Sequence, residues 1–260
     1  MSKIPFLWLS AVKKLPMSLS KNQTKLINSL RQKKYRQEYG LFVAEGIKVV
    51  NELLNSNLEI EQLFVTEPNL ISIKDSSKVV LITASELKKV SAFKSPNKVL
   101  GIFKIPKEKE VKEKGIILAL DTINDPGNLG TIIRLCDWFG IQELVCSKDT
   151  VDCYNQKVIQ STMGSITRVN IVYIDLVDFL KNATIPVFTA DMNGQNVYNA
   201  DLPKEAILVM GNEANGISEA VTSAIQQKLT IPRFGDVQET ESLNVATATA
   251  ILLSEFKRRT

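Results

Sequence analysis

Polar and glycine residues that could hold a ligand gather after an apolar run near the middle of the chain. The run GIILAL (115–120) leads into an Asp-Pro-Gly turn that ends at Gly127, and Asn128 and Gly130 follow at the expected start of a helix. Such a turn can cradle phosphates, but a dinucleotide site needs GxGxxG and an ATP or GTP site needs GxxxxGK before Ser or Thr. Gly127 and Gly130 are spaced only as GxxG, so this turn alone does not indicate a nucleotide cofactor.

Arg134 stands six residues after Asn128, in the second turn of the expected helix. Two interpretations of this pair stay open. The two residues can belong to a functional site, or they can be a helix N-cap followed by a surface arginine.

A second polar loop, VMGNEANGIS (209–218), follows another apolar strand. Glu213 lies in this loop between two asparagines, and Gly211 and Gly216 flank the turn. Glycine permits positive φ and a close approach of the backbone. Ligands of parallel sheets bind at the carboxyl ends of the strands, which is where this carboxylate would lie. The alternative is an ordinary Asn-Gly turn.

A third loop runs from the Ile-Pro strand end at 231–232 to the Ser-Leu-Asn that opens the last helix. We expect Ser242 to be the N-cap of that helix. Ala246, Ala248 and Ala250 place small residues on several sides of the helix, which permits close packing within the chain or against a partner subunit.

The composition excludes several classes of site. The chain has no histidine, which rules out Ser-His and Cys-His catalytic pairs. Its three cysteines have no CxxC spacing, which argues against a disulfide framework or a zinc cluster. The apolar runs are too short to span a bilayer. The apolar patch in the first twenty residues lacks a convincing cleavage site and is interrupted by Lys13 and Lys14, so we expect a cytoplasmic protein.

The hydrophobic pattern divides the chain into four segments. Residues 1–40 carry nine Lys or Arg against one acid, in a basic extension with an expected helix from Ser20 to Gly40. Residues 41–106 alternate short strands and helices, as in a small α/β domain, and the charged segment 107–114 is the expected linker. In residues 115–260, apolar strands alternate with helices, which predicts a parallel sheet covered on both faces.

The three loops together resemble the SpoU/TrmH family of RNA 2′-O-ribose methyltransferases, in the SPOUT superfamily. The motifs that carry the resemblance are NxGxxxR at Asn128, Gly130 and Arg134, GxExxG at Gly211, Glu213 and Gly216, and an Ile-Pro strand end with SLNV at Ile231, Pro232 and Ser242–Val245. They extend over residues 115–258. Residues 42–54 resemble the start of the family's substrate-binding domain.

The resemblance implies a C-terminal methyltransferase domain tied into a trefoil knot, usually in a homodimer, after a small α/β substrate-binding domain. It implies S-adenosylmethionine as the cofactor, held by backbone around Gly211, Ile231 and Leu243, and it implies no metal. The implied reaction is methyl transfer to a ribose 2′-hydroxyl of structured RNA. We expect ribosomal RNA rather than transfer RNA because of the additional N-terminal domain.

The resemblance also assigns Arg134 to the ribose hydroxyl. Arginine is a poor base at its ordinary pKa. Either Arg134 takes the proton, or it stabilises the developing alkoxide or binds a phosphate while water takes the proton. The other implied catalytic residues, which would orient Arg134 and the ribose, are Asn128, Glu213, Ser242 and Asn244.

We expect the basic N-terminal segment to bind the RNA backbone, which supplies affinity and salt dependence but no sequence choice. The candidate RNA-binding residues are Lys25, Arg31, Lys33, Lys34 and Arg36. Arg168 and Arg233 are further phosphate candidates. From charge alone, the alternative is a solvated helix face.

Two other functions compete with the enzyme hypothesis. The second hypothesis is a non-catalytic protein that binds RNA or assists ribosome assembly with the same fold. The third is a nucleotide-dependent α/β enzyme, which the missing GxGxxG and GxxxxGK patterns disfavour.

Overall fold

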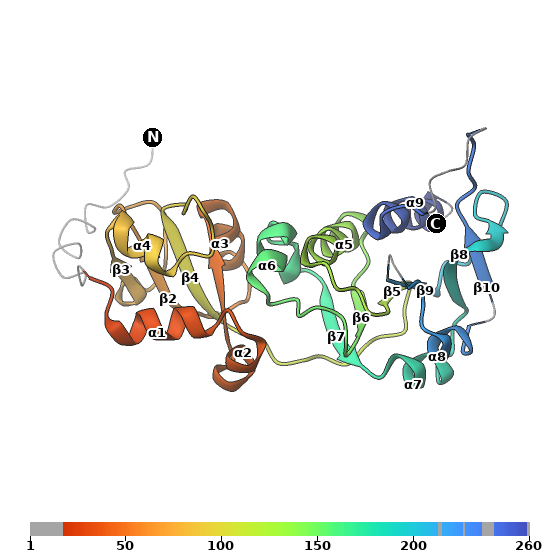
Figure 1. Cartoon of the computed structure of the whole chain (residues 1–260), viewed down its shortest axis with the longest axis horizontal. Coiled ribbons are helices and arrows are strands. Elements are labelled where there is room, and N and C mark those ends of the chain that lie inside the picture. The colour runs from red at the N-terminus through yellow and green to blue at the C-terminus, as the bar shows by residue number, and fades with distance from the viewer. Residues whose placement is uncertain (1–17, 213–214, 226, 236–241, 259–260) are drawn as a thin grey trace. The chain divides into compact units, whose positions relative to one another are not determined.

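The computed structural model describes residues 18–212, 215–225, 227–235 and 242–258. They form two compact units, drawn in Figure 1. Unit 1 contains the chain up to Pro106 together with Tyr154–Thr167, and unit 2 contains Lys107–Cys153 and the chain from Arg168 onward. None of the described helices is long and apolar enough to cross a membrane.

Unit 1 is built on a four-stranded sheet in which β2 and β3 are parallel and the other neighbours are antiparallel. Its strands, in spatial order, are β1 (Leu41–Glu45), β4 (Val99–Lys104), β2 (Ile60–Val65) and β3 (Val79–Leu81). Its helices are α1 (Lys21–Ser29), α2 (Lys33–Tyr39), α3 (Ile47–Leu54), α4 (Ala84–Val90) and α6 (Gln156–Thr162), with short 3-10 turns η3 (Ser76–Lys78) and η4 (Ser165–Thr167). The sheet and helices α1 and α4 enclose an apolar core that includes Ile27, Val43, Phe64, Leu87 and Leu100.

The basic segment folds as two helices, α1 and α2, where the sequence predicts one. The break falls at residues 30–32, and α2 ends at Gly40 in the left-handed conformation (φ 62°). Arg36 stabilises the break, because its Nη1 donates hydrogen bonds to the carbonyls of Leu30 and Arg31, both at 2.9 Å. Leu30 is fully buried. The chain therefore changes direction between α1 and α2 at Leu30, the point where its apolar side chain enters the core.

Residues 154–167 fold with unit 1, although the sequence groups them with residues 115–260. The ring of Tyr154 packs against Phe42 of β1, with centroids 4.9 Å apart. Gly164 (φ 98°) approaches α3 so closely that a Cβ on it would lie 2.5 Å from the Cβ of Glu52. These contacts join residues distant in the chain, so the local pattern does not reveal them.

Unit 2 is a six-stranded sheet in which all neighbouring strands are parallel, and this confirms the sheet that the sequence predicts. Its strands, in spatial order, are β10 (Gln227–Thr230), β8 (Val187–Asn196), β9 (Ala206–Met210), β5 (Ile116–Leu120), β6 (Glu143–Ser147) and β7 (Asn170–Ile174). The helices are α5 (Pro126–Phe139), α7 (Leu176–Lys181), α8 (Glu219–Thr222) and α9 (Val245–Arg258). Apolar residues of α7 and α8 pack on one face of the sheet, and Figure 1 shows α5 and α9 together on the other.

The end of the chain differs from the sequence pattern in three elements. β8 continues to Asn196, whereas the pattern PVFTAD predicts a strand over 186–191 only. β8 is longer because β10 pairs with it. Gly194 permits this pairing, since a Cβ on any other residue at this position would lie 2.6 Å from the backbone of Leu229. The pattern SEAVTSAIQQ predicts a helix over 218–227, but α8 has only four residues, since the chain from Gln227 joins β10. α9 begins at Val245.

Candidate functional site

The first motif lies on α5. Asp125 is the N-cap of this helix, and its Oδ1 accepts a hydrogen bond from the backbone N–H of Asn128 at 2.8 Å. Asn128 is therefore inside the first turn and is not the cap. Arg134 lies further along α5 with an exposed side chain, and no hydrogen bond or ion pair joins its guanidinium to another described residue.

One hydrogen bond between side chains joins the start of α9 to the start of α5. Asn244 Oδ1 accepts hydrogen bonds from the backbone N–H groups of Ala246 (3.0 Å) and Thr247 (3.3 Å). Asn244 is therefore the N-cap of α9, and the prediction of Ser242 as the cap is wrong. With its oxygen held by the backbone, Asn244 turns Nδ2 toward Asn128 and donates to Oδ1 at 3.0 Å. An amide can do both because it carries an acceptor and a donor.

The second motif lies where the chain folds back after β9. Asn212 and Gly216 exchange two backbone hydrogen bonds of 2.8 Å. A Cβ on Gly211 would lie 2.5 Å from the carbonyl group of Gly216, so this turn requires glycine. The side chain of Asn212 donates to the carbonyl of Thr122, just after β5, at 2.9 Å. Glu213 lies outside the described residues.

A pocket of about 730 Å³ opens at the carboxyl ends of β8, β9 and β10. Small-molecule sites of parallel sheets lie at this edge and have this size. The predicted site residues that line it are Gly211, Ile231, Ser242 and Leu243. Asn128, Arg134 and Asn244 do not line it, although Asn244 directly follows Leu243 in the chain.

The sequence does not single out the side chains that β8 contributes to this pocket. Thr189, Asp191 and Asn193, which alternate along the strand, line it. Lys228 Nζ donates to Asp191 Oδ2 at 2.7 Å, and this bond, assisted by the backbone N–H of Asn193, lowers the pKa of the Asp191 carboxyl. The sequence signal that could have identified these pocket residues is the change from apolar to polar residues after Phe188.

The lining of the pocket fits S-adenosylmethionine. Ile231, Pro232 and Leu243 offer apolar contacts for a purine ring. Gly211 and Gly216 lack side chains that would cover backbone hydrogen-bonding groups. Among the described residues, no group of three His, Cys, Asp or Glu side chains could hold a metal ion.

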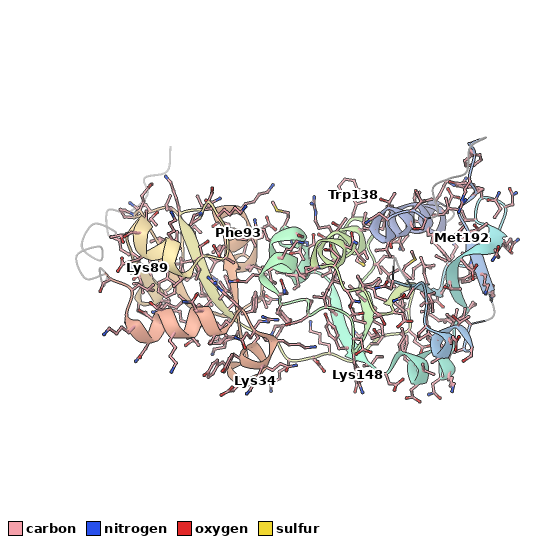
Figure 2. The ribbon with its side chains drawn as sticks, in the orientation of Figure 1. Lys34, Lys89, Phe93, Trp138, Lys148 and Met192 are labelled. Atoms are coloured by element: carbon pink, nitrogen blue, oxygen red, sulfur yellow. The ribbon has the colours of Figure 1, made fainter. Side chains whose placement is uncertain are left out.

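Four of the five expected RNA-binding side chains are exposed in unit 1. They are Lys25 on α1, Arg31 after that helix, and Lys33 and Lys34 on α2, and Figure 2 shows Lys34 on the outer side of its helix. Lys34 Nζ lies 5.8 Å from the ring centroid of Tyr35. The three lysines stay candidates for contact with RNA.

Two arginines of the same segment are engaged in the fold. Arg36 is only 2% exposed and closes the break between α1 and α2, which contradicts its assignment to RNA. Arg31 Nη2 donates to the carbonyls of Val90 (3.2 Å) and Ser91 (2.9 Å) at the end of α4. A basic run has the same composition whether its cations bind carbonyls or face solvent. The sequence therefore does not distinguish the arginines that bind backbone carbonyls from the lysines that face solvent.

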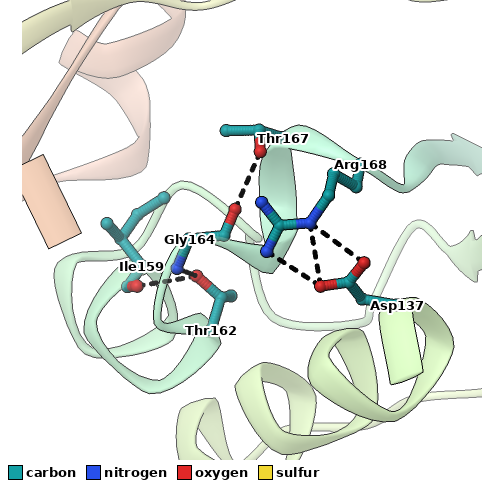
Figure 3. A network of polar contacts seen from close by, with 6 residues as sticks. All are labelled: Asp137, Ile159, Thr162, Gly164, Thr167 and Arg168. Atoms are coloured by element: carbon teal, nitrogen blue, oxygen red, sulfur yellow. Dashed lines mark hydrogen bonds and ion pairs between the residues drawn. The ribbon is translucent and has the colours of Figure 1, made fainter. Parts of the chain in front are cut away.

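Arg168 is paired within unit 2. Figure 3 shows its guanidinium against the carboxylate of Asp137, with Nε at 2.9 and 3.0 Å from the two oxygens and Nη2 at 2.9 Å from one of them. This ion pair engages the guanidinium group of Arg168, which is a candidate for binding phosphate in the sequence. Arg233 is exposed beside the pocket, with Nη2 3.7 Å from the sulfur of Met192.

Comparison with known proteins gives matches over both units. Residues 115–254 match the SpoU rRNA Methylase family, and residues 21–101 match the MRM3-like substrate binding domain. The 23S rRNA (guanosine(2553)-2′-O)-methyltransferase RlmP of Bacillus subtilis is 30% identical over 245 residues, which cover 92% of this chain and 97% of that protein.

Solved structures match over most of the chain. A TrmH-family protein from Porphyromonas gingivalis has a TM-score of 0.85 and 40% identity, and the match covers 93% of this chain and 99% of that one. An AdoMet-bound rRNA methyltransferase from Sinorhizobium meliloti has a TM-score of 0.83 and 29% identity, with coverage of 95% and 98%.

Proposed function

This chain belongs to the SpoU rRNA Methylase family, and from this membership we propose that it transfers a methyl group from S-adenosylmethionine to a ribose 2′-hydroxyl of ribosomal RNA. The relative from Bacillus subtilis is named for 2′-O-methylation of 23S rRNA, and the Sinorhizobium meliloti structure is AdoMet-bound. The match to a substrate binding domain supports a role of unit 1 in holding RNA. A cytoplasmic location and the trefoil knot stay predictions.

The observation that carries the proposal is the hydrogen bond between Asn128 and Asn244. Asn244 directly follows Ser242 and Leu243, which line the pocket, and Asn128 precedes Arg134 on α5 by six residues. The bond therefore ties the proposed cofactor loop to the helix that carries Arg134. A reacting constellation has to be held to within about 0.5 Å, and a contact between two helix starts is a rigid means of doing so.

The mechanism follows from what the side chains can do. Bound S-adenosylmethionine supplies a methyl group on a positively charged sulfur, and the thioether it leaves is neutral. The chain has to position the 2′-hydroxyl and to stabilise the negative charge that develops on its oxygen. Guanidinium groups do not act as bases in proteins. We therefore assign Arg134, whose side chain is exposed, to electrostatic stabilisation of that oxygen or of a neighbouring phosphate, and water takes the proton of the hydroxyl. Asn128, Ser242 and Asn244 act as positioning residues.

Glu213 is a further positioning residue, because it belongs to the second motif, GxExxG. In the sequence it stands three residues after β9, and Met210, the last residue of that strand, lines the pocket together with Gly211.

We include a homodimer in the same proposal. Three large apolar side chains near the pocket are exposed, namely Met192 (61%), Phe234 (81%) and Leu243 (45%). A second copy of the chain would cover them. Sedimentation equilibrium at micromolar concentration should give twice the mass of the chain, and a monomer at all concentrations would contradict this part of the proposal.

The enzyme proposal is tested by methyl incorporation. The protein is incubated with tritiated S-adenosylmethionine and with total RNA and ribosomal particles from a strain that lacks its gene. We expect label in one ribosomal RNA species, at a ribose. Absence of label from every RNA, together with absence of cofactor binding by calorimetry, would favour the non-catalytic RNA-binding protein instead.

Arg134→Ala tests the catalytic assignment. Removal of one donor that stabilises a developing oxyanion lowers turnover by about 10²–10³-fold. Cofactor affinity should stay within a few-fold, because Arg134 does not line the pocket. Thr131→Ala, also at an exposed position of α5, is the matched control and should methylate at the normal rate. Near-normal turnover of Arg134→Ala would remove Arg134 from the mechanism.

A further inference from the structure

Thr122, just after β5, has a backbone conformation that its side chain disfavours. Its φ angle is 58°, in the left-handed region. A residue that is branched at Cβ rarely adopts this region, because Cβ then crowds the following carbonyl oxygen. Among the described residues of unit 2, no other residue apart from glycine has a positive φ angle. Such a conformation persists only where the surrounding contacts enforce it, and residues of this kind cluster at functional sites.

The hydrogen bonds of the Thr122 backbone explain this conformation. β5 ends at Leu120 and lies between β9 and β6. The N–H of Thr122 donates to Ser147 Oγ at the end of β6 at 2.9 Å, and its carbonyl accepts from Asn212 Nδ2, just after β9, at 2.9 Å. In an extended strand, the N–H and the carbonyl of one residue bond to the same neighbouring strand. Thr122 reaches both neighbours because its backbone leaves the extended conformation.

Asp121 holds the loop of the second motif (residues 211–218) at its other end. The side chain of Asp121 is buried, and its Oδ2 accepts a hydrogen bond from the backbone N–H of Ser218 at 2.8 Å. Its Oδ1 accepts from the hydroxyl of Thr122 at 3.0 Å. Two adjacent residues at the end of β5 therefore bind this loop, one at Asn212 and the other at Ser218.

The loop that these contacts hold forms part of the pocket wall. Of its described residues, those that line the pocket include Gly211, Asn212, Gly216 and Ile217. Asn212 Oδ1 accepts from the backbone N–H of Asn215 at 3.2 Å, so the amide of Asn212 bonds both within the loop and to the end of β5. A wall that is fixed before the ligand arrives loses less entropy on binding, which favours affinity.

We propose that Thr122 is a positioning residue for S-adenosylmethionine. Its left-handed backbone directs its carbonyl to Asn212, and together with Asp121 it fixes residues 211–218 as a wall of the pocket. The inference rests on the proposed function, since it takes the pocket to be the site of S-adenosylmethionine.

Asn212→Asp tests the contact with Thr122 in the full-length protein. The carboxylate still accepts from the N–H of Asn215 but has no donor for the carbonyl of Thr122. Loss of this bond should raise the Kd for S-adenosylmethionine, measured by calorimetry, about 5- to 100-fold. Asn199→Asp makes the same change of charge at an exposed position outside the pocket. This matched control should bind the cofactor like the wild type.

Two substitutions of Thr122 separate the role of its backbone from that of its hydroxyl. Glycine adopts a positive φ angle freely, so Thr122→Gly should bind S-adenosylmethionine nearly as well as the wild type. Thr122→Val keeps the branched Cβ but lacks the hydroxyl that bonds to Asp121 and helps to enforce the conformation, so it should bind more weakly. Equal loss of affinity in both variants would show that the left-handed backbone is not what holds the loop, and would overturn the inference.

Steady-state kinetics distinguish positioning of the cofactor from a general structural role. In Asn212→Asp, the KM for S-adenosylmethionine should rise, and kcat at saturating cofactor should fall by a smaller factor, because bound cofactor stabilises the pocket wall. The melting temperature should stay close to that of the wild type. A lower kcat and melting temperature with an unchanged KM would assign the contact to the fold alone, against the inference.

Binding by the wild-type protein separates the two possible failures. If the wild type binds no S-adenosylmethionine, the proposed function has failed. If the wild type binds it and Asn212→Asp binds it equally well, the proposed function stands and the role of Thr122 is wrong.

Discussion

At the scale of single residues, Asn244 has two roles that one side chain can fill only as an amide. Its oxygen caps α9 through the N–H groups of Ala246 and Thr247, and its nitrogen donates to Asn128. Aspartate caps helices as well as asparagine does but has no donor. Alanine can do neither. The two substitutions therefore separate helix capping from the contact between the motifs.

Asn244→Asp should keep the stability of the protein and lose methyl transfer. The cap survives, while the carboxylate repels the oxygen of Asn128 and moves α5 relative to the pocket loop. Asn244→Ala should lose methyl transfer and also about 1 kcal/mol of unfolding free energy, the usual effect of removing an N-cap. Denaturant titration and initial rates of methylation measure the two effects. Wild-type activity in Asn244→Asp would show that the contact with Asn128 does not position Arg134.

At the scale of the elements, the break between α1 and α2 is stabilised by a cation, Arg36. This residue lies within a segment whose positive charge suggests RNA binding. The guanidinium of Arg36 supplies donors for two carbonyls that the end of α1 leaves without helical partners. Lys33 and Lys34, three and two residues earlier, are exposed. The basic segment therefore contains structural and exposed cations side by side.

Arg36→Ala should destabilise the protein, whereas Lys33→Ala with Lys34→Ala should weaken RNA binding. Each hydrogen bond from a charged group contributes about 1.5–3 kcal/mol, so we expect a loss of roughly 3 kcal/mol of unfolding free energy for Arg36→Ala. The double lysine variant should unfold like the wild type. Its RNA affinity should fall, and the slope of log affinity against log salt should decrease by about one for each phosphate that the variant no longer binds. An Arg36→Ala variant of normal stability would contradict the role of Arg36 as a cap.

At the scale of the whole molecule, the three cysteines are free thiols and all lie buried in unit 2. Burial raises the pKa of the Cys136 thiol and of the Cys146 thiol far above their ordinary value. A raised thiol pKa means that less of the reactive thiolate is present at a given pH. Both the protonation of these thiols and their burial therefore protect them from alkylation.

We expect the native protein to resist alkylation by iodoacetamide at pH 8 and to incorporate three labels once it is unfolded in guanidinium chloride. Mass spectrometry counts the labels. Because no cysteine lies in unit 1, the alkylation rate reports the opening of unit 2 alone. Rapid labelling of the native protein at one site would show that the thiol there is accessible.

The alternation of strands and helices, the parallel sheet of unit 2 and the three candidate loops can all be predicted from the amino-acid sequence. These are local properties, since an apolar strand, a glycine turn and a helix start each leave a pattern within a few residues. The strands and helices expected over residues 41–106 are present for the same reason.

Which of these residues come into contact cannot be predicted from the sequence and is known from the folded chain. The bond between Asn128 and Asn244 spans 116 positions, the pocket draws on three strand ends, and residues 154–167 fold with unit 1. Tertiary structure also decided that Arg36 caps a helix while Lys34 faces solvent. Such outcomes depend on long-range packing, whose geometry is set by the whole sheet and core and leaves no periodic trace in the neighbouring sequence.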